Sequence, residues 1–191
     1  MSAARPVIAA SRYTSAPFPA YRYVPGRSPH PTAHPDGHSY RRPGEAAPPV
    51  VFVPPERWYA SRDYLSGCDL YNHGYWWEAH EAWEGLWQLC DKAGAQGQFL
   101  QGLIQVAACH LKLASGQWRA VVRLFQTSRE HLRFTLERMA GLEYMGLELR
   151  PFMANVDAYY DRLERLPADA RCHDPLTYPY LVLAGRGEGL T

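Results

Sequence analysis

One tryptophan-rich stretch decides the fold, and it reads Tyr75-Trp76-Trp77-Glu78-Ala79-His80-Glu81-Ala82-Trp83-Glu84-Gly85-Leu86-Trp87. The stretch contains no proline and only one internal glycine, so nothing in it interrupts a helix. At about 100° per residue, Ala79, Ala82 and Leu86 fall on one face, which tryptophans flank. The pattern predicts a helix that runs to about Cys90 and buries this face against neighbouring helices.

Polar side chains border the buried face of this helix. His80 and Glu84 are one turn apart and therefore lie side by side, next to Trp77, while Glu78 and Glu81 complete a polar arc. Three interpretations stay open for His80 and Glu84: a hydrogen-bonded pair that stabilises the fold, two ligands of a divalent metal ion, or an acid/base pair. The zinc-protease signature H-E-x-x-H needs a second histidine where Glu84 stands, so the stabilising pair is preferred. No cofactor is expected, and if a metal binds, His80 and Glu84 are its expected ligands.

Apolar side chains at helical spacing predict four more helices. Aromatic and leucine residues after Pro54 favour a first helix that ends near Gly74, a residue suited to a helix C-terminus. The other three are expected at about 95–115, 117–139 and 151–166, and residues between the last two read as a loop. The sequence therefore predicts an all-α protein, a compact bundle of about five helices.

The predicted helix at 95–115 is apolar around most of its circumference, which makes it the central helix of the bundle. Gln101 and Gln105 form a narrow polar stripe opposite its most apolar face. An amide can donate a hydrogen bond to a carboxylate, so these glutamines are expected partners for Glu81 or Glu84. A closed polar network between the two helices is the favoured interpretation.

The two ends of the chain differ from this helical core. Ten of the sixteen prolines lie in residues 1–50, where apolar residues show no helical or alternating period. Residues 1–53 are therefore expected to be a disordered tail that contains proline and arginine. The bundle is expected to occupy residues 54–167, and residues 168–191 an irregular C-terminal tail.

Composition excludes several classes of function. The net charge is +1, and the arginines of the tail are too scattered for a nucleic-acid surface. No run of apolar residues is long enough for a signal peptide or a membrane span. The four cysteines lack C-x-x-C spacing, which favours free thiols in a reducing compartment. We therefore expect a cytoplasmic protein that binds neither nucleic acid nor membrane.

The chain resembles the domain of unknown function 309 family, small all-helical proteins of bacteria and archaea. The features that carry the resemblance are Leu70-Tyr71-Asn72-His73-Gly74-Tyr75-Trp76-Trp77-Glu78-Ala79-His80-Glu81 followed by Glu84 and Trp87, then Leu100-Gln101-Gly102-Leu103-Ile104-Gln105-Val106-Ala107-Ala108, and Gly116. The resemblance covers roughly residues 58–166. It implies a compact bundle in which the His/Glu helix packs against the Gln-containing helix, and it implies no established activity.

The resemblance also implies a set of candidate site residues. The polar signature of the family falls on Glu78, His80, Glu81, Glu84, Gln101 and Gln105, with Trp87 as the aromatic neighbour. The helical pattern adds Trp77 and Trp83 as further aromatic neighbours. The expected function is a non-enzymatic interaction module that binds another protein or itself, in which these polar residues form a structural network. Exposed tryptophan or tyrosine side chains of the first two helices would be its contact surface. The alternative is a metal-dependent or acid/base hydrolase that uses His80, Glu81 and Glu84.

Overall fold

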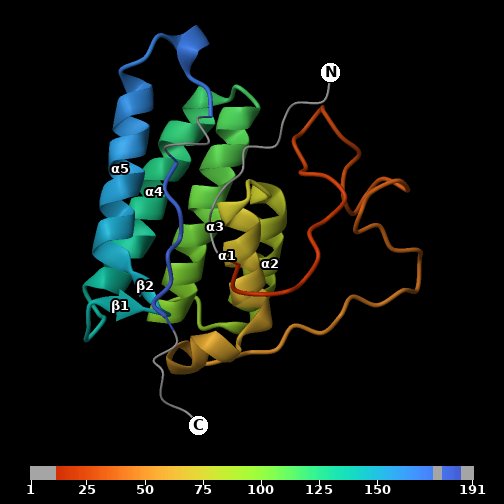
Figure 1. Ribbon diagram of the computed structural model, residues 1–191, viewed down its shortest axis with the longest axis horizontal. Helices are drawn as coiled ribbons and strands as arrows, with labels where there is room; N and C mark the ends of the chain where they lie inside the picture. The colour runs from red at the N-terminus through yellow and green to blue at the C-terminus, as the bar shows by residue number, and fades with distance from the viewer. Residues whose placement is uncertain (1–11, 174–177, 186–191) are drawn as a thin grey trace.

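The computed structural model describes residues 12–173 and 178–185, and these residues form an all-α bundle, as the sequence predicts (Figure 1). Its five α-helices are α1 (Arg62–Asn72), α2 (Trp76–Leu89), α3 (Ala95–Ala114), α4 (Trp118–Leu136) and α5 (Leu149–Glu164). The helix α3 packs against both α2 and α4, α1 packs against α2, and α5 packs against α4. Eleven of the twenty residues of α3 are buried, so α3 is the central helix that the sequence predicts.

The shorter helices α1 and α2 approach each other closely. Gly74 joins them with a positive φ of 79°, which a glycine adopts without strain. A Cβ atom at Gly67 of α1 would lie only 2.2 Å from Nε1 of Trp83, so only a glycine leaves room for this indole. Trp83 is fully buried, and its Nε1 donates to the carbonyl oxygen of Tyr64 at 3.3 Å. The indole of Trp83 thus fixes the close approach of α1 and α2.

The first helix starts later than the sequence predicts. Residues Pro55–Ala60 form a separate 3₁₀-helix, η1, and α1 begins only after Ser61. The hydroxyl of Ser61 accepts a hydrogen bond from the backbone N–H of Tyr64, which is the interaction that defines a helix N-terminus.

The predicted loop over 141–150 is also more ordered than expected. It contains the hairpin strands β1 (Glu143–Tyr144) and β2 (Leu147–Glu148), which pair antiparallel. Met145 and Gly146 both have positive φ, as a two-residue hairpin turn requires. The helix α5 then begins at Leu149, so Pro151 lies in its first turn, where the missing N–H costs no helical hydrogen bond.

The largest difference from the sequence prediction concerns the N-terminal segment, which we define as residues 12–53. This segment forms no helix or strand, in agreement with its proline content, but it lies against α1 and α2 and is not the free tail that the sequence suggested (Figure 1). The ring of Phe18 stacks on Tyr75 with centroids 5.0 Å apart, and Val53 accepts a hydrogen bond from the side chain of Gln96 at 2.8 Å. Buried polar groups of the bundle, which composition does not reveal, hold the segment in place.

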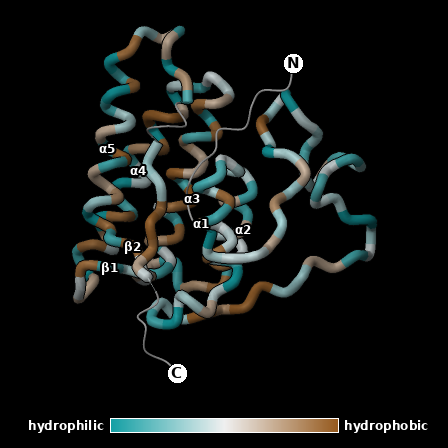
Figure 2. Tube along the Cα trace, in the orientation of Figure 1, coloured by the Kyte–Doolittle hydropathy of each residue, from teal (hydrophilic) through white to brown (hydrophobic). Residues whose placement is uncertain are grey.

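The C-terminal part of the chain returns along the bundle. Leu181 is buried, and its backbone N–H and C=O form hydrogen bonds of 2.8 and 2.7 Å with the side chain of Asn72. Leu183 pairs with Leu147 of β2, and Figure 2 shows hydrophobic residues along this segment where it crosses the bundle. Irregular C-terminal structure was expected, and in residues 178–185 it packs on the core.

Among the described residues, no helix combines the length and the apolar character needed to cross a lipid bilayer.

Candidate functional site

The predicted site on α2 brings a histidine and two carboxylates together. The Nδ1 atom of His80 lies 3.3 Å from Oε1 of Glu81 and 3.8 Å from Oε2 of Glu84. One ligand atom from each of the three residues lies within 4.8 Å of the others. The three side chains keep 29%, 43% and 41% of their surface exposed, in the same order. We call these residues the His80 cluster; it is a half-exposed polar group on the surface of α2.

The two predicted glutamine partners do not join the His80 cluster. The hydroxyl of Thr127 on α4 donates to Oε1 of Gln105, so this amide is oriented toward α4. Neither Gln101 nor Gln105 forms a hydrogen bond with Glu81 or Glu84 in the described part of the chain. The predicted closed network between α2 and α3 is therefore wrong. Glu81 and Glu84 keep about two fifths of their surface in water, so neither carboxylate needs an amide partner.

The three neighbouring tryptophans have different environments. Trp83 is buried in the core, as described above. Trp77 contacts the N-terminal segment, where the rings of Tyr23 and His30 meet it edge-on at 5.5 and 5.6 Å. Trp87 packs partly on the core, and the ammonium group of Lys92 lies 3.7 Å from its ring centroid. All three indoles serve packing or the N-terminal segment.

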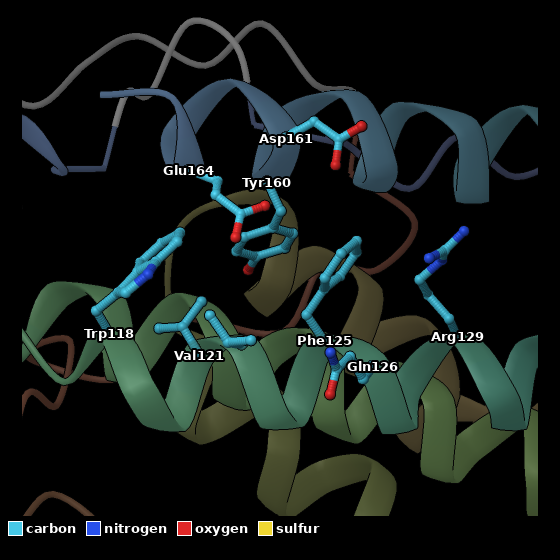
Figure 3. A pocket seen from close by; sticks show the side chains of 9 residues that line it. Trp118, Val121, Phe125, Gln126, Arg129, Tyr160, Asp161 and Glu164 are labelled. Carbon is cyan, nitrogen blue, oxygen red and sulfur yellow. The ribbon is translucent and has the colours of Figure 1, made fainter. Parts of the chain in front are cut away.

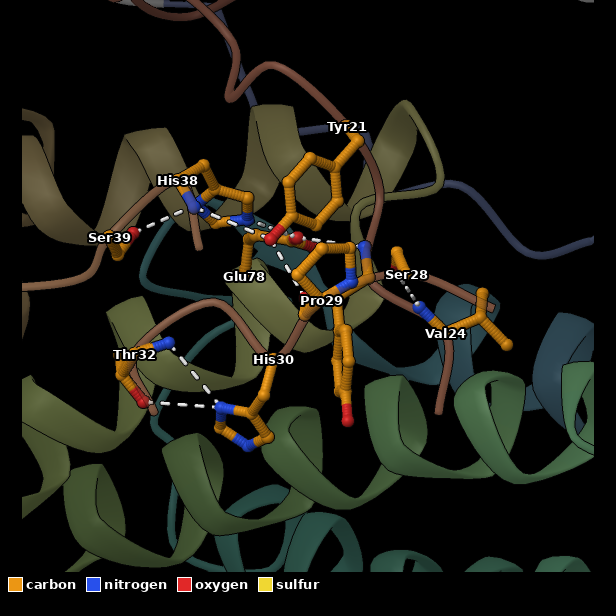
Figure 4. A network of polar contacts seen from close by, with 10 residues as sticks. Tyr21, Val24, Ser28, Pro29, His30, Thr32, His38, Ser39 and Glu78 are labelled. Atoms are coloured by element: carbon orange, nitrogen blue, oxygen red, sulfur yellow. Dashed lines mark hydrogen bonds and ion pairs between the residues drawn. The ribbon is translucent and has the colours of Figure 1, made fainter. Parts of the chain in front are cut away.

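Glu78, the remaining acid of the predicted set, is buried under the N-terminal segment (Figure 4). Its Oε1 atom accepts a hydrogen bond from the backbone N–H of Tyr23 at 2.9 Å and contacts Nε2 of His38 at 2.9 Å. The side chains of Glu78 and His38 are only 4% and 5% exposed. The second oxygen of Glu78, Oε2, is buried without a hydrogen-bond partner. The acid is thus held by groups that come from far away in the sequence.

A second buried acid of the same face was not predicted from the sequence. Asp69 of α1 is 1% exposed, and both its oxygens accept hydrogen bonds from the start of the N-terminal segment. The backbone N–H groups of Tyr13 and Thr14 lie 2.7 and 2.9 Å from Oδ1 and Oδ2, and the Thr14 hydroxyl lies 2.7 Å from Oδ2. Arg12 adds a longer ion pair of 3.8 Å. We call the surface around Asp69, Tyr75, Trp77 and Glu78 the α1–α2 face.

A third polar group, again not predicted, lies in the centre of the bundle. His110 of α3 is fully buried, and its Nε2 and Nδ1 atoms lie 2.9 and 3.4 Å from the hydroxyls of Tyr71 and Tyr160. Because Tyr71 donates its proton to the carbonyl oxygen of Pro179 at 2.9 Å, its oxygen accepts from Nε2 of His110. The Tyr160 hydroxyl then donates to Nδ1, and the imidazole is neutral.

The pKa values of this central group agree with a neutral, closed network. Burial and the neighbouring His173 lower the pKa of His110 well below its ordinary value. Burial raises the pKa of Tyr71 and of Tyr160 well above the ordinary value of a phenol. All three side chains therefore stay uncharged in the folded protein, and they stabilise the core without an accessible reacting atom.

A small pocket between α4 and α5 does not supply a reaction site either (Figure 3). Its volume is about 230 Å³, below the usual range for ligand pockets of about 300–1,000 Å³. Arg129 at its edge is paired with Asp157 at 2.9 Å, and the Tyr160 ring forms part of its wall. The arginine is thereby committed to the contact between α4 and α5.

Comparison with known proteins gives a family and no activity. The family model described as a domain of unknown function (DUF309) matches residues 64–124, from the first turn of α1 into α4. No curated protein and no solved structure matches the chain. The matched region contains Asp69, Glu78 and the His80 cluster, whereas the N-terminal segment lies outside it. Residues 64–124 are therefore similar to the DUF309 family.

Proposed function

We propose that this protein is a non-enzymatic helical interaction module whose α1–α2 face binds an extended polypeptide segment. The observation that carries the proposal is the pair of buried carboxylates, Asp69 and Glu78, which backbone N–H groups of the N-terminal segment reach at 2.7 to 2.9 Å. Backbone N–H groups occur in every polypeptide, so carboxylates at these positions can hold an extended chain with little regard to its sequence.

Aromatic contacts give the same face its selectivity. Phe18 stacks on Tyr75, and Tyr23 and His30 meet Trp77 edge-on. Aromatic side chains are the most common anchors of protein interfaces. In this chain the face is occupied by the chain's own N-terminal segment, so the proposed partner is a polypeptide of similar aromatic and cationic character, including the same segment of a second copy. The four free cysteines favour the cytoplasm as its compartment.

The proposal is tested on the full chain after one cut. A site for a specific protease is placed at the exposed residues 46–48, and the folded protein is cleaved there. We expect the N-terminal fragment to stay with the bundle in size-exclusion chromatography and to exchange with an added, labelled peptide of residues 12–46. Glu78→Gln should weaken peptide binding by about tenfold, because a charge-assisted hydrogen bond becomes a neutral one.

A matched control removes a glutamate charge elsewhere. Glu130 is exposed on α4, so Glu130→Gln should leave binding of the labelled peptide unchanged. Immediate separation of the cleaved fragment from the bundle, or equal peptide affinities for the two variants, would contradict the proposal.

One observation favours a second candidate function, a divalent cation site at the His80 cluster. An imidazole nitrogen and two carboxylate oxygens within 4.8 Å of one another suit Zn²⁺ or Mn²⁺, and small side-chain rotations would bring them to about 2.0–2.2 Å from one ion. Three protein ligands leave coordination positions for water, as hydrolytic metal sites require. Calorimetric titration of tag-free protein with ZnCl₂ tests this candidate. His80→Ala should abolish binding and His34→Ala, in the N-terminal segment, should not; equal binding by both variants excludes the site.

A further inference from the structure

A basic pocket opens where the two ends of the chain meet the bundle. Its volume is about 510 Å³, within the usual range for small-ligand pockets. Arg22 and Arg27 of the N-terminal segment line one part, and Arg171 and His173 of the C-terminal part line another. Trp76, at the start of α2, contributes to its wall. The pocket thus collects cationic side chains from segments that are about 145 residues apart in the sequence.

Among the described residues, no acidic side chain balances the positive charge of this pocket. None of the described residues that line it is acidic, and none of its three arginines forms an ion pair with a described carboxylate. Arg22 lies over the Tyr75 ring, with Cζ 5.2 Å from the ring centroid, and Arg171 lies over Trp118 at 4.4 Å. Arg171 also donates to the carbonyl oxygens of Leu163 and Glu164 at the end of α5, both at 3.1 Å. Two of the three guanidinium groups are therefore held in position without an anionic partner.

Trp76, one of the residues that line the pocket, also has a hydrogen-bond donor without an acceptor among the described residues. The indole Nε1 of Trp76 is buried without a hydrogen-bond partner, although the residue is only 7% exposed. No side chain caps the first turn of α2, which starts at Trp76, so its first backbone N–H groups also keep their positive partial charge. An unpaired buried donor is costly, and an oxygen-rich ligand would relieve that cost.

We infer that this pocket binds a small ligand that carries a phosphate group. Guanidinium groups pair with phosphate oxygens through parallel hydrogen bonds, and a dianion or trianion matches a site of three arginines better than a single carboxylate does. A helix N-terminus in the wall is a frequent feature of phosphate sites. Arg22 and Arg27 belong to the N-terminal segment, so the site requires this segment to lie on the α1–α2 face, as it does in the structure; the hydrogen bonds of Asp69 and Glu78 remain free of the phosphate ligand.

Binding is measured on the full chain by calorimetric titration with inorganic pyrophosphate at constant ionic strength. We expect saturable binding of one pyrophosphate per chain. Arg27→Gln should weaken it by at least about tenfold, because one charge-assisted contact is lost. Arg27 is exposed, so this substitution should leave the circular dichroism spectrum unchanged. Arg150→Gln, an exposed arginine at the start of α5, is the matched control and should bind as the parent does.

A chemical readout locates the ligand. Cys172 is exposed and lines the pocket, whereas Cys90 is half-buried and lies outside it. Pyrophosphate should slow alkylation of Cys172 by iodoacetamide and leave the rate at Cys90 unchanged, as mass spectrometry of the two peptides would show. Absence of saturable binding, equal affinities of Arg27→Gln and Arg150→Gln, or unprotected Cys172 would overturn the inference. Citrate that binds as tightly as pyrophosphate would overturn its assignment to phosphate.

Discussion

The helix α2 carries acids of two kinds. One is buried and contributes to the fold, and the other two lie at the surface. Glu78 is buried and contacts the N-terminal segment, whereas Glu81 and Glu84, one and two turns further, keep about two fifths of their side chains in water. Asp69 on α1 belongs with Glu78. A buried carboxylate requires partners, so the position of the first kind depends on other parts of the chain, while the second kind is satisfied by solvent.

The partners of the buried acids also lie outside the family match. Asp69 and Glu78 fall within residues 64–124, but the N–H groups and the imidazole that contact them come from residues 13–38. The helical domain thus supplies the acceptors of the α1–α2 face, and a separate segment supplies the donors. This division of roles is what we expect of a binding surface and its ligand that have become parts of one chain.

Removal of a buried acid should have the largest effect on stability. Asp69→Ala leaves the Tyr13 and Thr14 donors without acceptors, so we expect the free energy of unfolding to fall by about 3 kcal/mol. Chemical denaturation measures the loss, and hydrogen exchange should show the backbone amides of Tyr13 and Thr14 exchanging faster. A change below about 0.5 kcal/mol, the range of ordinary surface substitutions, would place Asp69 with the exposed acids.

Burial of histidine side chains makes the stability of the protein depend on pH. Burial lowers the pKa of His110 well below the ordinary histidine value of about 6.5, so the folded protein leaves this imidazole neutral where the unfolded chain protonates it. Its contribution is therefore complete above about pH 6.5 and declines as the pH falls below that value, by up to about 1.4 kcal/mol per pH unit. The pKa of His131 is also lowered by burial and acts in the same direction.

Urea denaturation between pH 7.5 and pH 5 measures this dependence. His110→Gln keeps a hydrogen-bonding side chain but cannot take up a proton, so the loss of stability per pH unit should shrink by as much as one proton's contribution. An unchanged pH dependence in this variant would show that other groups cause the acid sensitivity.

The sequence predicts the helical bundle well because helix formation depends on local periodicity. The apolar face of residues 75–87 and the nearly all-apolar helix at 95–115 are visible in the amino-acid order alone, and the structure confirms both. The His80 cluster was found for the same reason, since residues three or four positions apart on a helix are neighbours, as Glu81 and His80 each are to Glu84.

The buried polar groups could not be found in this way. The partner of Glu78 is His38, forty residues earlier, and Asn72 binds Leu181, more than one hundred residues later. No local spacing encodes such pairs. The prolines of the N-terminal segment correctly exclude helices, but the absence of regular structure does not imply the absence of packing, because buried acceptors such as Asp69 can order an irregular backbone.

Substitution in the half-exposed His80 cluster should change the stability least. His80 is 29% exposed, and its Nδ1 atom, although buried, forms no hydrogen bond and approaches Glu81 and Glu84 only at 3.3 and 3.8 Å. His80→Ala should therefore lower the free energy of unfolding by about 0.5 kcal/mol or less, as surface substitutions do. Denaturation curves of this variant and of Asp69→Ala, recorded side by side, measure the contrast. A loss of 2 kcal/mol or more, on the scale of about 1–3 kcal/mol for an unsatisfied buried group, would show that the His80 cluster is a structural network and would erase the distinction between the two kinds of acid on α2.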